Sequence, residues 1–125
     1  MESKKLSQIL VYFIFFILIL NFLANTFHLY YSIWWFDALM HFLGGLWVAL
    51  ACLYLFPLQN SSANSIFKIL LLVLIVGVGW EVFEFVFYDY FASNPFNPID
   101  TISDVFFDLS GGSCAILYVW KKLPK

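Results

Sequence analysis

Residues 66–88 read IFKILLLVLIVGVGWEVFEFVFY and are apolar almost throughout. A helix of roughly 20 such residues spans the hydrocarbon core of a bilayer, which is about 30 Å thick. Three other stretches have a similar length and character, so four transmembrane helices are expected. They are predicted over about 6–24, 37–56, 66–88 and 101–120. The sequence therefore predicts an all-α, integral membrane four-helix bundle that forms a single transmembrane domain over residues 1–125.

The composition agrees with a membrane protein. Of the 125 residues, 63% are hydrophobic, 22% are aromatic and only 11% are charged, which excludes an ordinary soluble domain. The links at 57–65 and 91–100 are rich in Asn, Ser and Pro, which favour turns. The link at 25–36 contains the aromatic run HLYYSIWWF, typical of a segment at the membrane surface. Membrane lipids are thus the expected partners, and no basic patch for nucleic acid is present.

The lysines predict how the helices are oriented. All six flank the same ends of the predicted spans: Lys4, Lys5, Lys68, Lys121, Lys122 and Lys125. Because cytoplasmic loops are enriched in lysine, both termini are expected to be cytoplasmic. The start of the chain also fits a signal peptide, with a charged region before an apolar one. No A-x-A cleavage pattern follows, so we expect this segment to be retained as the first helix.

The acidic residues gather at the opposite ends of the spans. Seven of the eight lie there, together with His41: Asp37, Glu81, Glu84, Asp89, Asp100, Asp104 and Asp108. Positions four apart share a helix face, so the acids of each span form a stripe. Asp100 is expected near the membrane surface, and Asp108 about 12 Å deeper at the usual helical rise. The stripes predict a funnel of polar groups that opens to the outer face.

Two of the spans repeat the pattern D-x-x-x-[HD]-x-x-G-G, at 37–45 and 104–112. Both are expected to run from outside to inside. A duplicated helical hairpin with a pseudo-twofold axis along the membrane normal is therefore predicted, although the other two spans show no matching repeat. The paired glycines favour a close crossing of the second and fourth helices, which would bring their acids together.

The chain offers these acids few counter-charges. A single Asp at the centre of a membrane helix costs about 2.5 to 3.5 kcal/mol on insertion scales. There is no Arg, and every Lys is predicted at the far surface. Three solutions remain open, namely protonated acids hydrogen-bonded between helices, a water-filled cavity, or bound cations.

Carboxylates with one imidazole suit Mg²⁺, Mn²⁺, Ca²⁺ or Zn²⁺. The Glu-x-x-His pair of di-iron bundles is missing, so a di-iron centre is not expected. The predicted metal ligands are Asp37, His41, Glu81, Asp104 and Asp108. Glu84 or Asp100 is the predicted general base.

Three motifs in order, DALMHF at 37–42, WEVFEF at 80–85 and DTISDVFFDLSGG at 100–112, resemble the YjdF-like family. Its members carry D-x-x-x-H, E-x-x-E and D-x-x-x-D on transmembrane helices. The resemblance implies a protein of the bacterial cytoplasmic membrane whose biochemical activity is undefined. The chain is shorter than typical YjdF-like proteins. It is similar more weakly to VanZ-like proteins, from which it departs because Glu84 stands where a Gln is usual.

Three functions fit these residues. The leading hypothesis is a metal-dependent hydrolase or transferase that acts on a membrane lipid phosphate, because metal ions would neutralise the acids and bind an anionic head group. A proton- or cation-translocating transporter or channel subunit is the second, since intramembrane acids also form ion pathways. The cytoplasmic half has few polar residues, which favours an outward-facing pocket over a through-path. The third is a non-catalytic accessory protein. The sequence predicts no oligomeric state.

Overall fold

A computed structural model describes residues 3–58, 63–90 and 97–122, and for 88–90 the backbone alone. The elements are α1 (Ser3–Thr26), α2 (Leu29–Ser32), α3 (Phe36–Leu55), α4 (Ala63–Glu84), the π-helix η1 (Phe85–Tyr90) and α5 (Pro98–Lys121). No strand occurs in the described residues. Each predicted span corresponds to a helix long and apolar enough to cross a membrane, α4 together with the start of η1 forming the third. The predicted all-α membrane four-helix fold is confirmed.

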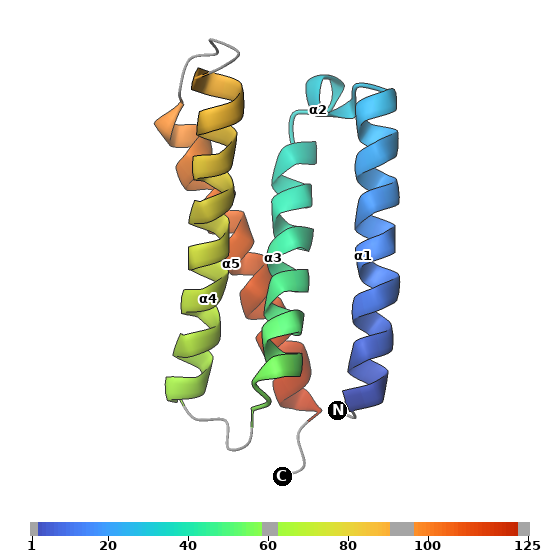
Figure 1. Cartoon of the computed structure of the whole chain (residues 1–125), viewed down its shortest axis with the longest axis vertical. Coiled ribbons are helices and arrows are strands. Elements are labelled where there is room, and N and C mark those ends of the chain that lie inside the picture. Colours follow the sequence, from blue (N-terminus) through green and yellow to red (C-terminus); the bar gives the residue numbers. More distant parts are fainter. Residues whose placement is uncertain (1–2, 59–62, 91–96, 123–125) are drawn as a thin grey trace.

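The long helices are arranged around α3 (Figure 1). Helices α1 and α4 lie on either side of α3, and α5 runs obliquely across α3 and α4. The backbone of α1 approaches α2 and α3 but neither α4 nor α5. The first turn of α1 and the last turn of α5 lie at the same end of the bundle, as the lysine pattern requires. Their cytoplasmic location and the duplicated hairpin remain predictions.

Local chemistry explains the start of α5. The side chain of Asn97 accepts hydrogen bonds from the backbone N–H groups of Ile99, at 3.1 Å, and Asp100, at 3.3 Å. Such a cap satisfies donors that have no partner within the helix, and Pro98 fits the first helical position because no N–H is needed there. The helix therefore begins three residues before the predicted span and holds Asp100 in its first turn.

The short helix α2 lies in the aromatic link and was not predicted from the sequence. His28, with a left-handed backbone (φ 56°), separates it from α1. The Tyr30 hydroxyl donates to Asn21 Oδ1 of α1 at 2.7 Å, and the Tyr30 ring packs edge-on against Phe36 at the start of α3, with 5.1 Å between ring centroids. Through these contacts α2 ties the end of α1 to the start of α3.

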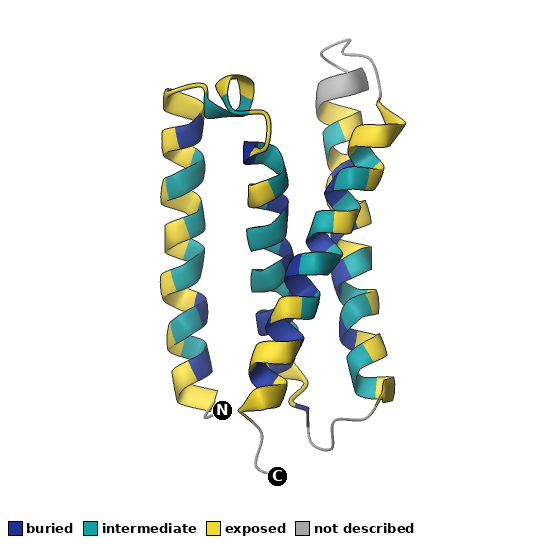
Figure 2. Ribbon diagram, turned by 180° about the vertical axis from the view of Figure 1, so that it is seen from behind, coloured by how far each residue is buried: buried dark blue, intermediate teal, exposed yellow. Residues whose placement is uncertain are grey.

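An apolar core fills the half of the bundle nearer the lysines (Figure 2). It consists of Leu6, Leu10, Ala49, Leu50, Leu53, Leu58, Ile69, Val73, Ala115, Ile116 and Val119. At its border, the Trp47 indole donates to the Leu10 carbonyl at 2.9 Å and joins α3 to α1. Many large apolar side chains on the outside of the helices are exposed, as expected where lipid is the solvent.

Helices α3 and α5 cross so closely that only glycine fits at the crossing. A Cβ added to Gly45 would collide with the backbone carbonyl of Asp108, and one added to Gly111 with that of Phe42. On α4, a Cβ at Gly77 would lie 2.6 Å from Asp108 Oδ2. The predicted close crossing of the second and fourth helices is thus confirmed, and it lies directly below the acids.

Candidate functional site

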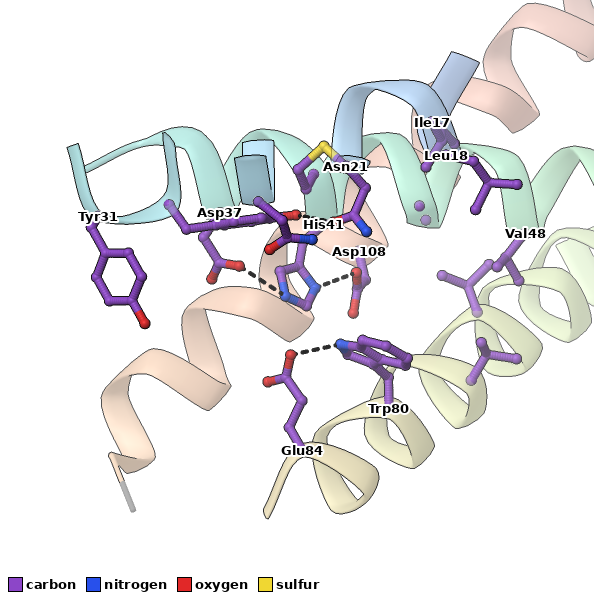
Figure 3. A pocket seen from close by; sticks show the side chains of 18 residues that line it. Ile17, Leu18, Asn21, Tyr31, Asp37, His41, Val48, Trp80, Glu84 and Asp108 are labelled. Carbon is purple, nitrogen blue, oxygen red and sulfur yellow. Dashed lines mark hydrogen bonds and ion pairs between the residues drawn. The ribbon is translucent and has the colours of Figure 1, made fainter. Parts of the chain in front are cut away.

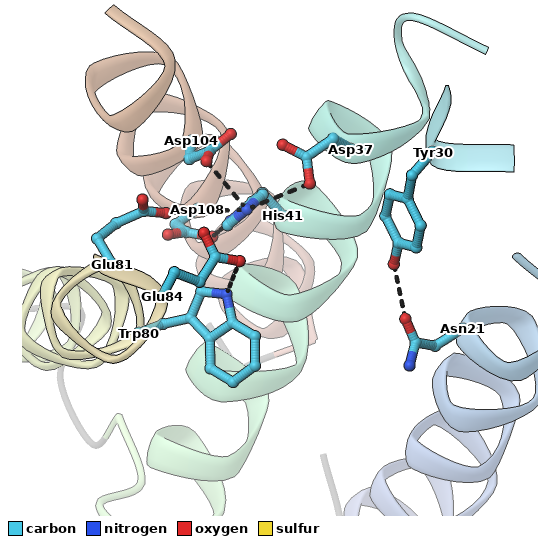
Figure 4. Close-up of polar contacts among 9 residues, drawn as sticks. All are labelled: Asn21, Tyr30, Asp37, His41, Trp80, Glu81, Glu84, Asp104 and Asp108. Carbon is cyan, nitrogen blue, oxygen red and sulfur yellow. Dashed lines mark hydrogen bonds and ion pairs between the residues drawn. The ribbon is translucent and has the colours of Figure 1, made fainter. Parts of the chain in front are cut away.

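His41 of α3 stands at the centre of a group of carboxylates (Figure 4). Its Nδ1 atom lies 3.1 Å from Asp108 Oδ1. Its Nε2 atom lies 3.3 Å from Asp104 Oδ2, 3.7 Å from Asp37 Oδ1 and 3.9 Å from Glu81 Oε1. The acids come from α3, α4 and α5, so three helices converge on one imidazole. We call these five residues the His41 cluster.

The two ring nitrogens of His41 have different surroundings. If Asp108 is ionised, its carboxylate only accepts hydrogen bonds, so Nδ1 donates to it and Nε2 faces the other three acids. The distances from Nε2, 3.3 to 3.9 Å, exceed the roughly 2.7 to 2.9 Å of a charge-assisted hydrogen bond. Atoms that share a tetrahedral ion at about 2.0 to 2.1 Å lie about 3.3 to 3.4 Å apart. The spacing around Nε2 is closer to that of a ligand set than to that of direct hydrogen bonds.

Most of the His41 cluster is buried. The exposed fractions are 8% for His41, 9% for Glu81, 3% for Asp104 and 6% for Asp108. Within the described residues, three buried oxygens have no hydrogen-bond partner: Glu81 Oε1, Asp104 Oδ2 and Asp108 Oδ2. A buried polar atom without a partner costs about 1 to 3 kcal/mol, and more when it is charged. These oxygens therefore need a proton, a water molecule or a cation.

The distribution of charge in the described part of the chain also shows that the acids of the His41 cluster need a partner. The lysines there belong to the first turn of α1, the second turn of α4 and the end of α5, at the far end of the bundle. His41 can carry at most one positive charge against the four carboxylates of its cluster. An isolated group of this kind would not be stable fully ionised in a dry membrane interior, so it must bind protons or metal ions or be solvated by water.

Glu84 belongs to a second, overlapping group. Carboxylate oxygens of Glu81, Glu84 and Asp104 lie within 4.8 Å of one another, as do ligand atoms of Asp37, His41 and Asp104. Glu84 is half-buried and accepts a hydrogen bond from the Trp80 indole at 2.9 Å. Sequence reasoning missed Trp80, although its position four residues before Glu84 is the spacing at which helical side chains meet.

Asp100 and His28 are both exposed, unlike most of the His41 cluster. Asp100 is exposed in the first turn of α5 and belongs to neither of the two ligand groups. His28 is exposed, as the sequence predicts for a residue of the aromatic link. The side chain of Asp89 lies outside those described.

A cavity of about 580 Å³ opens beside the His41 cluster, between α1, α3 and α4 (Figure 3). One end is polar and is lined by Asn21, Asn25, Tyr30, Tyr31, Asp37, His41, Glu84 and Asp108. Towards the other end the lining is apolar, with Ile17, Leu18, Val48, Val73 and Val76. Sequence reasoning missed Asn21 and Asn25, the two polar residues that close the first predicted span. The volume falls in the range of about 300 to 1,000 Å³ typical of small-molecule sites.

The fold and this cluster define a class, that of polytopic α-helical membrane proteins with a buried carboxylate and histidine site at one end. The family model described as "Predicted membrane protein (DUF2238)" matches residues 2–125, so the chain belongs to that family. This is the YjdF-like family that the motifs resemble, and that expectation is confirmed. No curated protein and no solved structure is similar enough to match. The weaker likeness to VanZ-like proteins and the bacterial origin remain predictions.

Proposed function

We propose that this protein is a divalent-metal-dependent hydrolase or transferase that acts on a membrane lipid phosphate. The observation that carries the proposal is the arrangement around His41 Nε2, where carboxylate oxygens of three acids lie at 3.3 to 3.9 Å and the ligand atoms of Asp37, His41 and Asp104 lie within 4.8 Å of one another. Its second support is the cavity beside this arrangement, which is polar at one end and apolar at the other. We assign the protein to the bacterial cytoplasmic membrane, with the His41 cluster towards the outer face.

In this proposal Asp37, His41, Glu81 and Asp104 hold the metal. Asp108 takes a different role from the ligand predicted from the sequence, because its carboxylate bonds Nδ1 and so fixes the imidazole with Nε2 towards the ion. Carboxylate partners of this kind commonly orient metal-binding histidines. Mg²⁺, Mn²⁺, Ca²⁺ and Zn²⁺ all suit carboxylate oxygens, and the imidazole favours Zn²⁺ or Mn²⁺.

The bound ion would neutralise the acids, bind the phosphate and activate a water molecule. Glu84 is the proposed general base, since it lines the cavity next to the cluster, whereas Asp100 does not line it. In the hydrolase, the water oxygen bonds to phosphorus while Glu84 takes its proton. The bond from phosphorus to the ester oxygen breaks, and the departing oxygen receives the proton that Glu84 took from the water, which returns Glu84 to its ionised form. In a transferase, an acceptor hydroxyl would replace the water.

The transporter hypothesis is less well supported by the same structure. A conduction path requires polar groups through the whole thickness of the membrane. Within the described residues, the buried polar side chains are the four innermost members of the His41 cluster, and below them lies the apolar core. A site that opens to one face fits an enzyme better than a channel.

We expect Glu84→Gln to reduce turnover of a lipid phosphate by about 10²- to 10⁴-fold, the usual contribution of a general base, while bound metal is retained. Phosphate release from phosphatidic acid in detergent micelles with Mn²⁺ or Zn²⁺ measures turnover, and elemental analysis measures the metal. The matched control is Cys114→Ala, on an exposed position of α5 outside the cavity lining.

The wild-type protein could instead bind metal, release no phosphate and conduct cations when reconstituted in liposomes. That result would reject the enzyme hypothesis in favour of the transporter hypothesis. Equal turnover by Glu84→Gln and Cys114→Ala would remove Glu84 from the reaction.

A further inference from the structure

Gly44 differs from the glycines at the helix crossing. A Cβ added there meets nothing within 4 Å, although a Cβ on the neighbouring Gly45 would collide with α5. Gly44 lies inside α3 and lines the cavity. Glycine in a helix interior is about 0.5 to 1 kcal/mol less favourable than alanine. Helix packing therefore gives no reason for a glycine at this position, and the open space in front of Gly44 belongs to the cavity.

The cavity is open sideways along the membrane-spanning part of the bundle. Its walls come from α1 and α4, whose backbones do not approach each other. Three of the side chains that line it are about half exposed, Leu18 at 55%, Val76 at 49% and Trp80 at 49%. These side chains form a rim between α1 and α4, so a molecule in the bilayer can reach the cavity without passing through water.

The polar and apolar ends of the cavity are arranged like the head group and acyl chains of a lipid. Figure 3 shows Asp37, His41 and Glu84 towards one end and Leu18 and Val48 towards the other. The polar end lies near the start of α3, at the surface side of the span, and the apolar end lies deeper. A lipid of that leaflet has its head group at the surface and its acyl chains pointing to the bilayer centre.

We propose that the cavity admits a membrane lipid sideways between α1 and α4, with its phosphate beside the His41 cluster and one acyl chain along α3 over Gly44. Gly44 then determines how wide a chain can enter. This inference rests on the proposed function and adds the route and binding mode of the substrate. A transmembrane helix of a partner is the poorer occupant, because an apolar helix would offer no polar group to Asp37, His41 and Glu84 at the polar end of the cavity.

The test compares Gly44→Leu with Gly79→Leu, since a Cβ at Gly79 also meets nothing within 4 Å but Gly79 does not line the cavity. Each protein is placed in nanodiscs with phosphatidic acid that carries a photoactivatable diazirine in one acyl chain. Adducts are then located by mass spectrometry. We expect wild type and Gly79→Leu to be labelled at the cavity lining, and the labelling of Gly44→Leu there to be at least about ten-fold weaker. The ratio of phosphatidic acid turnover to turnover of glycerol 3-phosphate, which has no acyl chain, should fall by a similar factor in Gly44→Leu and stay unchanged in Gly79→Leu.

The labelling and the turnover separate the two proposals. Labelling spread evenly over the lipid-facing sides of the helices, or unchanged by Gly44→Leu, would overturn the inference about the cavity. Labelling of the cavity that Gly44→Leu removes would support the lipid site. If the same protein turned over no phosphate substrate, the lipid site would stand but the proposed enzymatic function would be rejected. Equal loss of turnover of phosphatidic acid and of glycerol 3-phosphate in Gly44→Leu would show that the substitution disturbs the cluster itself, and the width-setting role would be rejected.

Discussion

Replacement of His41 by alanine is expected to weaken divalent-ion binding by at least about 100-fold and to abolish turnover of lipid phosphate. The change removes the Nε2 atom, which faces Asp37, Glu81 and Asp104. It also removes the Nδ1 atom, which contacts Asp108. Loss of a residue that only orients a ligand typically costs about 10- to 100-fold in affinity, so loss of the central ligand should cost more. Titration of metal-free protein with Mn²⁺, followed by electron paramagnetic resonance, measures the affinity.

The matched control is the other histidine, exchanged as His28→Asn. His28 is exposed and has a left-handed backbone, which Asn tolerates better than most residues. This variant should bind Mn²⁺ like the wild type. If His41→Ala also bound Mn²⁺ with wild-type affinity, the imidazole would not be a ligand and the carboxylates alone would hold the cation.

Substitution of Gly45 or Gly111 by alanine is expected to destabilise the bundle by about 1 to 3 kcal/mol or more. The added Cβ collides with backbone, the carbonyl of Asp108 or of Phe42, so a change of side-chain rotamer cannot relieve the contact. The helices must separate, which also moves Asp108 away from His41. Thermal unfolding in detergent measures stability, and Mn²⁺ titration of the same samples should show weaker binding.

Gly79→Ala is the control for the crossing, because nothing lies within 4 Å of the added Cβ. It should be neutral or stabilise the protein by up to about 1 kcal/mol through a better helix propensity. Equal stability of Gly45→Ala and Gly79→Ala would contradict the close packing of α3 against α5.

Much of the fold was predictable because it depends on local properties of the chain. Apolar length defines the four spans, and helix periodicity with alternating direction gathers the acids at one end. The structure accordingly brings Asp37, His41, Glu81 and Asp104 together. The helix ends differ from the predicted bounds by a few residues, since caps such as Asn97 extend a helix beyond its apolar part.

The arrangement inside the site was not predictable in the same way. Which ring nitrogen faces which acid depends on how α5 crosses α3 at Gly45 and Gly111, and this rotation is a property of the packed pair. The sequence groups Asp108 with the ligands, which remains a prediction, but it does not indicate the contact of Asp108 Oδ1 with Nδ1. The cavity was not predictable either. It exists because α1 packs on α3 but does not reach α4, and no pattern in the sequence of α1 indicates this arrangement.

The most direct measurement of the central claim is elemental analysis of detergent-purified wild-type protein, with thermal unfolding before and after chelation. The account predicts at least one divalent ion per chain, a lower unfolding temperature after chelation, and loss of both effects in Asp104→Asn. An ion that binds only the folded state must stabilise it, so the two readouts should change together. Protein that contains no stoichiometric metal and is indifferent to the chelator would contradict the account, and the acids of the His41 cluster would then be protonated and hydrogen-bonded between helices.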